Sequence, residues 1–266
     1  MSKIGNATHE IYQMDTLAAR DQWTNRIHPL VKLVLTVIYI ATVVSFSKYD
    51  IIGLAGMAVY LIAGFLLGEL SFRNCLRRLR IVLPLVCVVG LANPFLDRTP
   101  VYLGAMQINA GVISMITLML KGIFAVLASY LLIATTSIEK ICYALRLLRI
   151  PKILVTQILL TYRYITVLLN EVGRMTQAYA LRAPGQKGIH IKAWGSLVGL
   201  LLLRSIDRAT ELYESMTLRG YSGDYLYLAG KNRLRWQDIC YLAIWLAVIF
   251  LCRRFPIILL IGNWFA

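Results

Sequence analysis

Residues 108–136 decide the class of protein: they read INAGVISMITLMLKGIFAVLASYLLIATT, with Lys121 as their only charge. A run of about 20 predominantly apolar residues is long enough to cross a bilayer as an α-helix. Inside the bilayer every backbone N–H and C=O must be paired within the protein, and an α-helix pairs them all. The sequence therefore predicts a membrane-spanning helix here, and we expect further spans on either side of it.

Four further apolar runs extend this pattern. Lys32 is the one charge in the first, near its start, where its side chain is expected to extend to the membrane interface. Pro84 and Pro94 interrupt the third run. The runs cover residues 30–47, 51–68, 81–95 and 239–251. We therefore expect an all-α, polytopic membrane protein with about five transmembrane helices and long amphipathic cytoplasmic helices.

The composition excludes the other broad classes. Of the 266 residues 59% are hydrophobic and only 15% are charged, with a mean hydropathy of +0.67. Soluble domains have about half apolar and a quarter charged residues, and disordered chains have far fewer apolar ones. The five cysteines have no spacing typical of a secreted disulfide framework. An integral membrane protein remains.

The net charge of +15 predicts the orientation. Bases gather at the N-terminus and in the loop 69–80, and they flank apolar runs, which argues against nucleic acid and for the positive-inside rule. We expect a multi-pass protein of the cell (inner) membrane. Its N-terminus, the loop 69–80 and the segment after Thr136 would be cytoplasmic. No cleavable signal peptide is expected in the first thirty residues. The side on which residues 252–266 lie stays open.

The segment between the fourth and fifth spans is basic, yet it keeps helical periodicity. A short helix is expected over about 138–148, and a long amphipathic one from after Pro151 to before Pro184. A third helix is expected over about 191–218, with Gly220 as its C-terminal cap. We therefore divide the chain into a membrane domain (1–136), a coupling-helix domain (137–235) and a last transmembrane helix with its tail (236–266).

Few residues have a pattern that indicates catalysis. The three histidines, His9, His28 and His190, lack metal-ligand spacing, and we expect them to be interfacial or solvated. There is no P-loop and no nucleophile elbow. We expect no catalytic residue, no metal site and no directly bound cofactor. Lys121 is interpreted as an anchor that pairs with backbone carbonyls, with a substrate role as the alternative.

Two helix ends share a pattern. The long helix closes with Leu181, Arg182 and Ala183, and the next closes with Leu218, Arg219 and Gly220. One such arginine would be explained by the helix dipole, because a cation in the last turn is stabilising. Two matching ends on long cytoplasmic helices favour docking points, at which a guanidinium enters a carboxylate-lined groove of a partner.

At these residues the sequence resembles the transmembrane T component of energy-coupling factor (ECF) transporters, which carries two Ala-Arg-Gly motifs at the ends of coupling helices. Here leucine replaces the first alanine in both motifs, and Ala183 replaces a glycine. The stretch Arg26-Ile-His-Pro-Leu-Val-Lys32 resembles the entry to the family's first span. Its His-Pro step is more similar to the cobalt/nickel branch than to the vitamin branch.

The resemblance implies a non-catalytic subunit that links one or two P-loop ATPase subunits, which hold ATP and Mg, to a small substrate-binding membrane protein. Arg182 and Arg219 would each seat in one ATPase. The apolar face from Leu154 to Met175 and the face from Ile206 to Met216 would contact each other and the substrate-binding subunit. Residues expected at that contact are Leu154, Ile158, Ile165, Tyr213 and Met216.

Cobalt or nickel uptake is the favoured function, and three alternatives stay open. A vitamin importer of the same family would carry cobalamin, biotin or thiamine. A stand-alone permease would pass its substrate by Lys121 and Asn109. A membrane enzyme acting on lipid or isoprenoid would need an essential acid or histidine.

Overall fold

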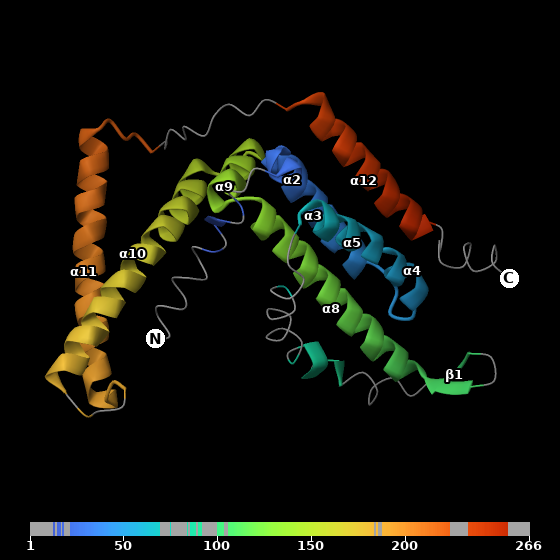
Figure 1. Ribbon diagram of the computed structural model, residues 1–266, viewed down its shortest axis with the longest axis horizontal. Helices are drawn as coiled ribbons and strands as arrows, with labels where there is room; N and C mark the ends of the chain where they lie inside the picture. The colour runs from blue at the N-terminus through green and yellow to red at the C-terminus, as the bar shows by residue number, and fades with distance from the viewer. Residues whose placement is uncertain are drawn as a thin grey trace. The chain divides into compact units, whose positions relative to one another are not determined.

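The computed structural model divides into two compact units, each described by itself (Figure 1). The α3–α8 unit comprises Ala18–Ser137 and Asn232–Ala266, and the α10–α11 unit comprises Met1–Leu17 and Ile138–Lys231. The structure describes residues 13, 15–16, 18, 22–69, 75, 84, 86–88, 90–91, 100–103, 106–183, 185, 188–223 and 234–254. Most of the expected third span, of the basic loop 69–80 and of the tail 252–266 lies outside these residues.

The α3–α8 unit is built from helices that match the expected apolar runs. They are α2 (Trp23–Arg26), α3 (Pro29–Val44), α4 (Ile51–Gly56), α5 (Ala58–Leu67), α8 (Ala110–Thr135) and α12 (Trp236–Arg254). The second expected span is two helices, because the chain turns at Met57, whose N–H bonds to the Leu54 carbonyl at 3.0 Å. The predicted all-α class is confirmed in these helices.

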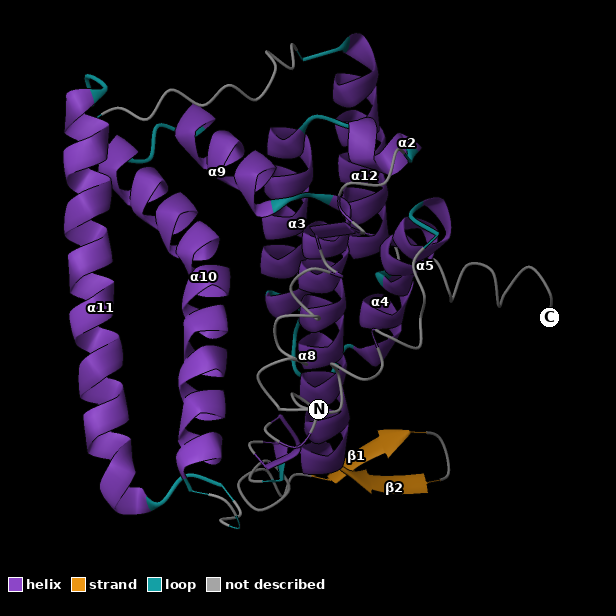
Figure 2. Cartoon of the chain, turned by 60° about the vertical axis from the view of Figure 1, so that its left-hand side comes forward, coloured by secondary structure: helices purple, strands orange, loops and turns teal. Residues whose placement is uncertain are grey.

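A short hairpin is the exception to the helical class. β1 (Pro100–Leu103) and β2 (Met106–Asn109) pair antiparallel, with Pro100 opposite Asn109 (Figure 2). They lie between the expected third apolar run, which ends at residue 95, and α8. Val101, Tyr102 and Ile108 are residue types that favour strands. The hairpin ends where α8 begins, so Asn109 is a strand residue outside the helix.

Aromatic and aliphatic side chains form the core of this unit around α3. Eight of the sixteen α3 residues are buried, Tyr39 completely. The ring of Tyr39 lies 4.5 Å from that of Tyr60, which lies 5.0 Å from the ring of Trp245 on α12. The Tyr39 hydroxyl donates to the Met57 carbonyl at 3.1 Å, at the turn between α4 and α5. Helices distant in sequence are therefore joined through one aromatic cluster.

Two lysines join α3 and α8 at opposite ends. Lys32 donates from Nζ to the Thr135 carbonyl at 2.9 Å, at the end of α8. Lys121 donates to the carbonyls of Val44 (3.1 Å) and Phe46 (2.6 Å), at the end of α3. The last carbonyls of a helix lack intrahelical partners and attract cations. The expectation that Lys32 extends to the interface is wrong, because its side chain is buried against α8. The interpretation of Lys121 as a carbonyl-bound anchor is confirmed.

One carboxylate accepts hydrogen bonds from backbone N–H groups at the starts of two helices. Asp238, buried near the start of α12, accepts from the backbone N–H of Arg235 at 2.9 Å and from that of His28 at 3.1 Å. His28 is itself the N-cap of α3, where its Nδ1 accepts from the N–H of Leu30. The expectation that His28 is interfacial or solvated is therefore wrong, because the ring is buried as a helix cap.

The α10–α11 unit consists of α9 (Ile138–Leu147), α10 (Lys152–Arg182) and α11 (Ile191–Leu218). All three were predicted to within one residue at each end. In the described part of the chain, three helices are long and apolar enough to cross a membrane: Gly111–Thr135, Lys152–Arg182 and Trp236–Arg254. α10 combines this length with polar residues along one side, and its placement in the cytoplasm stays a prediction.

Candidate functional site

The candidate site is the pair of long helices α10 and α11 with their arginine-bearing ends. α10 starts at a turn that is packed against α9. Cys142 of α9 forms a small core with Val155 and Leu159 of α10, and Leu145 and Ile150 close over it. Burial, and secondarily Glu139, raises the pKa of the Cys142 thiol, so the thiol stays protonated and serves as an apolar packing group. The first turns of α10 are therefore held in place by α9.

α10 and α11 run antiparallel (Figure 2). Glu171 of α10 lies between two arginines: Arg174 of its own helix at 2.8 Å and Arg204 of α11, which is within ion-pair distance. Both arginines are well exposed, so water and salt screen these pairs. The ion pair aligns the two helices and adds little to their stability.

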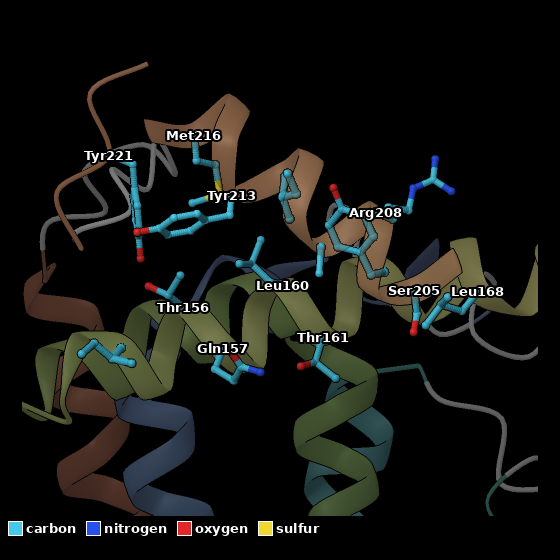
Figure 3. A pocket seen from close by; sticks show the side chains of 14 residues that line it. Thr156, Gln157, Leu160, Thr161, Leu168, Ser205, Arg208, Tyr213, Met216 and Tyr221 are labelled. Carbon is cyan, nitrogen blue, oxygen red and sulfur yellow. The ribbon is translucent and has the colours of Figure 1, made fainter. Parts of the chain in front are cut away.

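A groove of about 450 Å³ runs between the two helices on one side of this ion pair. Its apolar lining includes Leu160, Leu168, Tyr213 and Met216, and Figure 3 shows the side chains of the two helices facing one another across it. Thr156, Gln157, Thr161, Ser205 and Arg208 add polar atoms. An open, mostly apolar groove in which two helices leave space between them is a surface that a partner can fill.

The α10 face that lines this groove matches the expected one only in part. Ile153, Leu160 and Tyr164 line the groove, whereas Leu154, Ile158 and Ile165 are exposed elsewhere on the helix. On α11, Tyr213 and Met216 line the groove, whereas Ile206 does not. Leu154, Ile158, Ile165 and Ile206 are not among the groove-lining residues, and their contact with a substrate-binding subunit stays a prediction. Those exposed side chains remain available to a partner or to lipid.

α11 ends in a glycine-dependent cap that positions Arg219. The N–H of Tyr221 bonds to the Met216 carbonyl and that of Gly220 to the Thr217 carbonyl, both at 2.9 Å. This is the Schellman pattern, and Gly220 supplies the positive φ (84°) that it needs. Tyr221 and Met216 also line the groove, so the cap contributes residues to the groove lining. The predicted role of Gly220 as the C-terminal cap is confirmed.

Both arginine-bearing ends are open to the surroundings. Leu181 is 83% exposed and Leu218 is 89% exposed, although leucine is usually buried. Arg182 and Arg219 are exposed beside them, Ala183 is half-buried and Gly220 is exposed. Because the helices are antiparallel and α11 has 28 residues at 1.5 Å each, the two ends are about 42 Å apart. The hairpin therefore presents two similar ends that one small surface cannot contact together.

Other polar residues have local structural roles. His190 caps α11 by accepting from the Lys192 N–H, as His28 does for α3. The Tyr162 hydroxyl donates to Asp15 at 2.7 Å, which ties the residues before α2 to α10. Among the residues that the structure describes, no group of three or more His, Cys, Asp and Glu side chains lies close enough together to hold a metal ion.

These features define a multi-pass helical membrane protein in which a packed group of helices accompanies an exposed helical hairpin with two arginine-bearing ends. The chain belongs to the CbiQ family, described as cobalt transport protein, which matches residues 20–227.

Relatives whose names state a function agree with this family, and one uncharacterized relative also matches the chain. An energy-coupling factor transporter transmembrane protein EcfT of Thermosediminibacter oceani is 26% identical, over 81% of this chain and 84% of its own length. The nickel permease LarQ of Lactiplantibacillus plantarum is 30% identical, over 43% of this chain and 41% of its own. An uncharacterized protein of Methanocaldococcus jannaschii, MJ1571, is 25% identical, over 80% and 75%. The resemblance to the T component of ECF transporters, of the cobalt/nickel branch, is confirmed.

Proposed function

We propose that this chain is the energy-coupling subunit of an ECF-type importer, which transmits ATP-driven motion from cytoplasmic ATPases to a small substrate-binding membrane subunit. The observation that carries the proposal is the hairpin with an exposed Leu-Arg pair at each end. Each guanidinium would enter a carboxylate-lined groove of one ATPase subunit, where a planar fork forms two parallel hydrogen bonds. ATP and Mg would be bound by the ATPases alone, and this chain would catalyse no reaction.

The separation of the two ends suggests how motion is transmitted. Two contacts about 42 Å apart would engage two ATPase subunits, one at each end. When the ATPases close on ATP, the ends would be moved relative to each other and α10 and α11 would shift as rigid rods. The screened Glu171 ion pairs would permit that shift. This mechanism would require α10 and α11 to lie on the cytoplasmic side, and we propose the same side for the N-terminus.

The double variant Arg182→Glu with Arg219→Glu tests the docking role. We expect at least a tenfold loss of ATPase subunits that co-purify in mild detergent, because each glutamate would face the carboxylates of the groove. Each single variant should lose less, because one contact remains. A matched control, Arg163→Glu with Lys192→Glu, makes the same charge change at exposed positions and should keep the ATPases. Full co-purification with the double variant would refute the docking role.

We propose cobalt or nickel ions as the substrate. The family description names cobalt, and one relative is named a nickel permease. In cells that lack this chain, uptake of radiolabelled nickel or cobalt should fall to background and return on complementation. Uptake of labelled cobalamin, biotin or thiamine that depended on the chain would instead favour the vitamin alternative. Metal uptake by liposomes that contain this chain alone would favour a stand-alone permease.

A further inference from the structure

The turn between α9 and α10 combines cations with exposed apolar side chains, and we call residues 146–154 the elbow. Arg146, Arg149 and Lys152 supply three positive charges, and the elbow contains no acidic residue. Four large apolar side chains of the elbow are exposed, Ile153 the most at 72%: Leu147, Leu148, Ile153 and Leu154. Such side chains are normally withdrawn from water, so the elbow has the composition of an amphipathic surface.

The backbone of the elbow is held in a defined shape. The N–H of Ile150 bonds to the Leu145 carbonyl at 3.3 Å and that of Arg149 to the Arg146 carbonyl at 3.1 Å, a second Schellman pattern. Ile150 and Leu145 both pack on the Cys142 core, as this pattern favours. Arg149 therefore has φ +60°, in the left-handed region that glycine prefers. An exposed cation is thus presented by a backbone that packing holds in a strained conformation.

We propose that the elbow binds anionic phospholipid headgroups at the membrane surface. Cations would contact the phosphates while the exposed leucines and Ile153 enter the interface, as in interfacial amphipathic segments. Each Lys or Arg near an anionic surface strengthens binding about fivefold. In the sequence the elbow follows a predicted membrane-spanning helix closely: it begins at Arg146, and α8 ends at Thr135. This inference does not depend on the proposed function.

The elbow differs from the two arginine-bearing ends assigned to the ATPases. Each of those ends has one exposed leucine beside one arginine, whereas the elbow has four exposed apolar side chains and three cations within nine residues. An acidic protein groove would recognise the charge and leave most of this apolar surface in water. A lipid interface accommodates both, and this argues for lipid over an acidic protein.

Native mass spectrometry of the detergent-purified full chain tests the proposal, with equal amounts of phosphatidylglycerol and phosphatidylcholine added. In the triple variant Arg146→Gln, Arg149→Gln and Lys152→Gln, the ratio of bound phosphatidylglycerol to bound phosphatidylcholine should fall at least tenfold. This ratio measures the preference for phosphatidylglycerol. The control, Arg163→Gln with Lys192→Gln, removes exposed cations from α10 and α11 outside the groove and should keep it. An unchanged preference in the triple variant would overturn the proposal. So would loss of co-purifying ATPases while the lipid preference is retained.

Arg149→Gly separates lipid binding from folding, because it removes one cation and relieves the positive φ. We expect phosphatidylglycerol retention to fall several-fold while the melting temperature rises. If the triple variant fails to fold, Arg149→Gly tests whether the elbow binds phosphatidylglycerol. Unchanged phosphatidylglycerol retention in Arg149→Gly would then refute the proposal.

Discussion

Two antiparallel helix pairs, α3 with α8 and α10 with α11, differ in how they are held together. α3 buries eight of its sixteen residues, whereas α11, described over its whole length, buries none of its 28. Lysines that reach the ends of the opposite helices join the first pair. An ion pair with an exposed arginine joins the second. The apolar side chains of the first pair pack against other helices of the same unit. Many apolar side chains of the second pair stay exposed and can bind other molecules.

This difference shows which residues serve folding and which are available for binding. In α3, apolar side chains such as Leu35 and Val31 are buried by contacts within the unit. In α11, equally apolar side chains such as Leu202 and Leu203 are exposed. Exposed apolar surface on this scale is typical of surfaces that contact a partner or a membrane. The comparison can be tested by substitutions whose effects should differ between the two pairs.

The largest effect is expected for Asp238→Ala. The substitution leaves the backbone N–H groups of His28 and Arg235 without their carboxylate acceptor in a buried place. Charge-assisted bonds of this kind contribute about 1.5–3 kcal/mol each, so we expect a loss of about 3 kcal/mol. Thermal unfolding in detergent measures it. Asp207→Ala on exposed α11 is the control and should change stability by less than about 0.5 kcal/mol. Equal effects of the two substitutions would contradict the comparison.

Opposite changes in stability are expected for a glycine of the α3–α8 unit and a glycine of α11. A Cβ on Gly64 of α5 would lie 2.5 Å from Leu131 of α8, so Gly64→Ala should destabilise the protein by about 1–3 kcal/mol. A Cβ on Gly195 of α11 would meet nothing within 4 Å, so Gly195→Ala should stabilise the helix by about 0.5–1 kcal/mol. Melting temperatures of the two variants should move in opposite directions. A destabilising Gly195→Ala would show that α11 is packed more closely than we describe.

The smallest effect on stability is expected for Glu171→Gln, about 0.5 kcal/mol, because both of its arginine partners are well exposed. Its effect on geometry should be larger, since Glu171 aligns α10 with α11. Double electron–electron resonance between spin labels at exposed Gln177 and Ser196 should show a broader distance distribution than in the parent protein. Glu214→Gln, also exposed, should leave the distribution unchanged. An unbroadened distribution in Glu171→Gln would show that packing alone aligns the helices.

Local sequence signals were sufficient for the helices of the α10–α11 unit. Pro151 precedes α10, and Gly220 supplies the conformation on which α11 ends. These residues restrict the backbone by their own covalent structure, so their effect can be predicted without knowledge of the tertiary fold. The helix ends that carry Arg182 and Arg219 were located for the same reason.

Contacts between distant residues could not be predicted in this way. Apolar residues cover several faces of α10, so periodicity indicates a helix without showing which face meets α11. Lys32 lies at a span end, where a lysine usually extends to the interface, and only the end of α8 explains why it turns inward. Asp238 has no local sequence signal for its bond to His28, because 210 residues separate them. The docking residues Arg182 and Arg219 remain proposals because their partners are separate chains.

The carboxylate of Asp238 has a consequence for the synthesis of this protein. The start of α3 emerges from the ribosome early, yet its acceptor is made 210 residues later. At about 5–20 residues per second, α3 exists for roughly 10–40 s before Asp238 is synthesised. α10 and α11 are translated within that interval. The first helices must therefore persist in an incomplete state until α12 arrives, and insertion of the last helix completes the packing of the first.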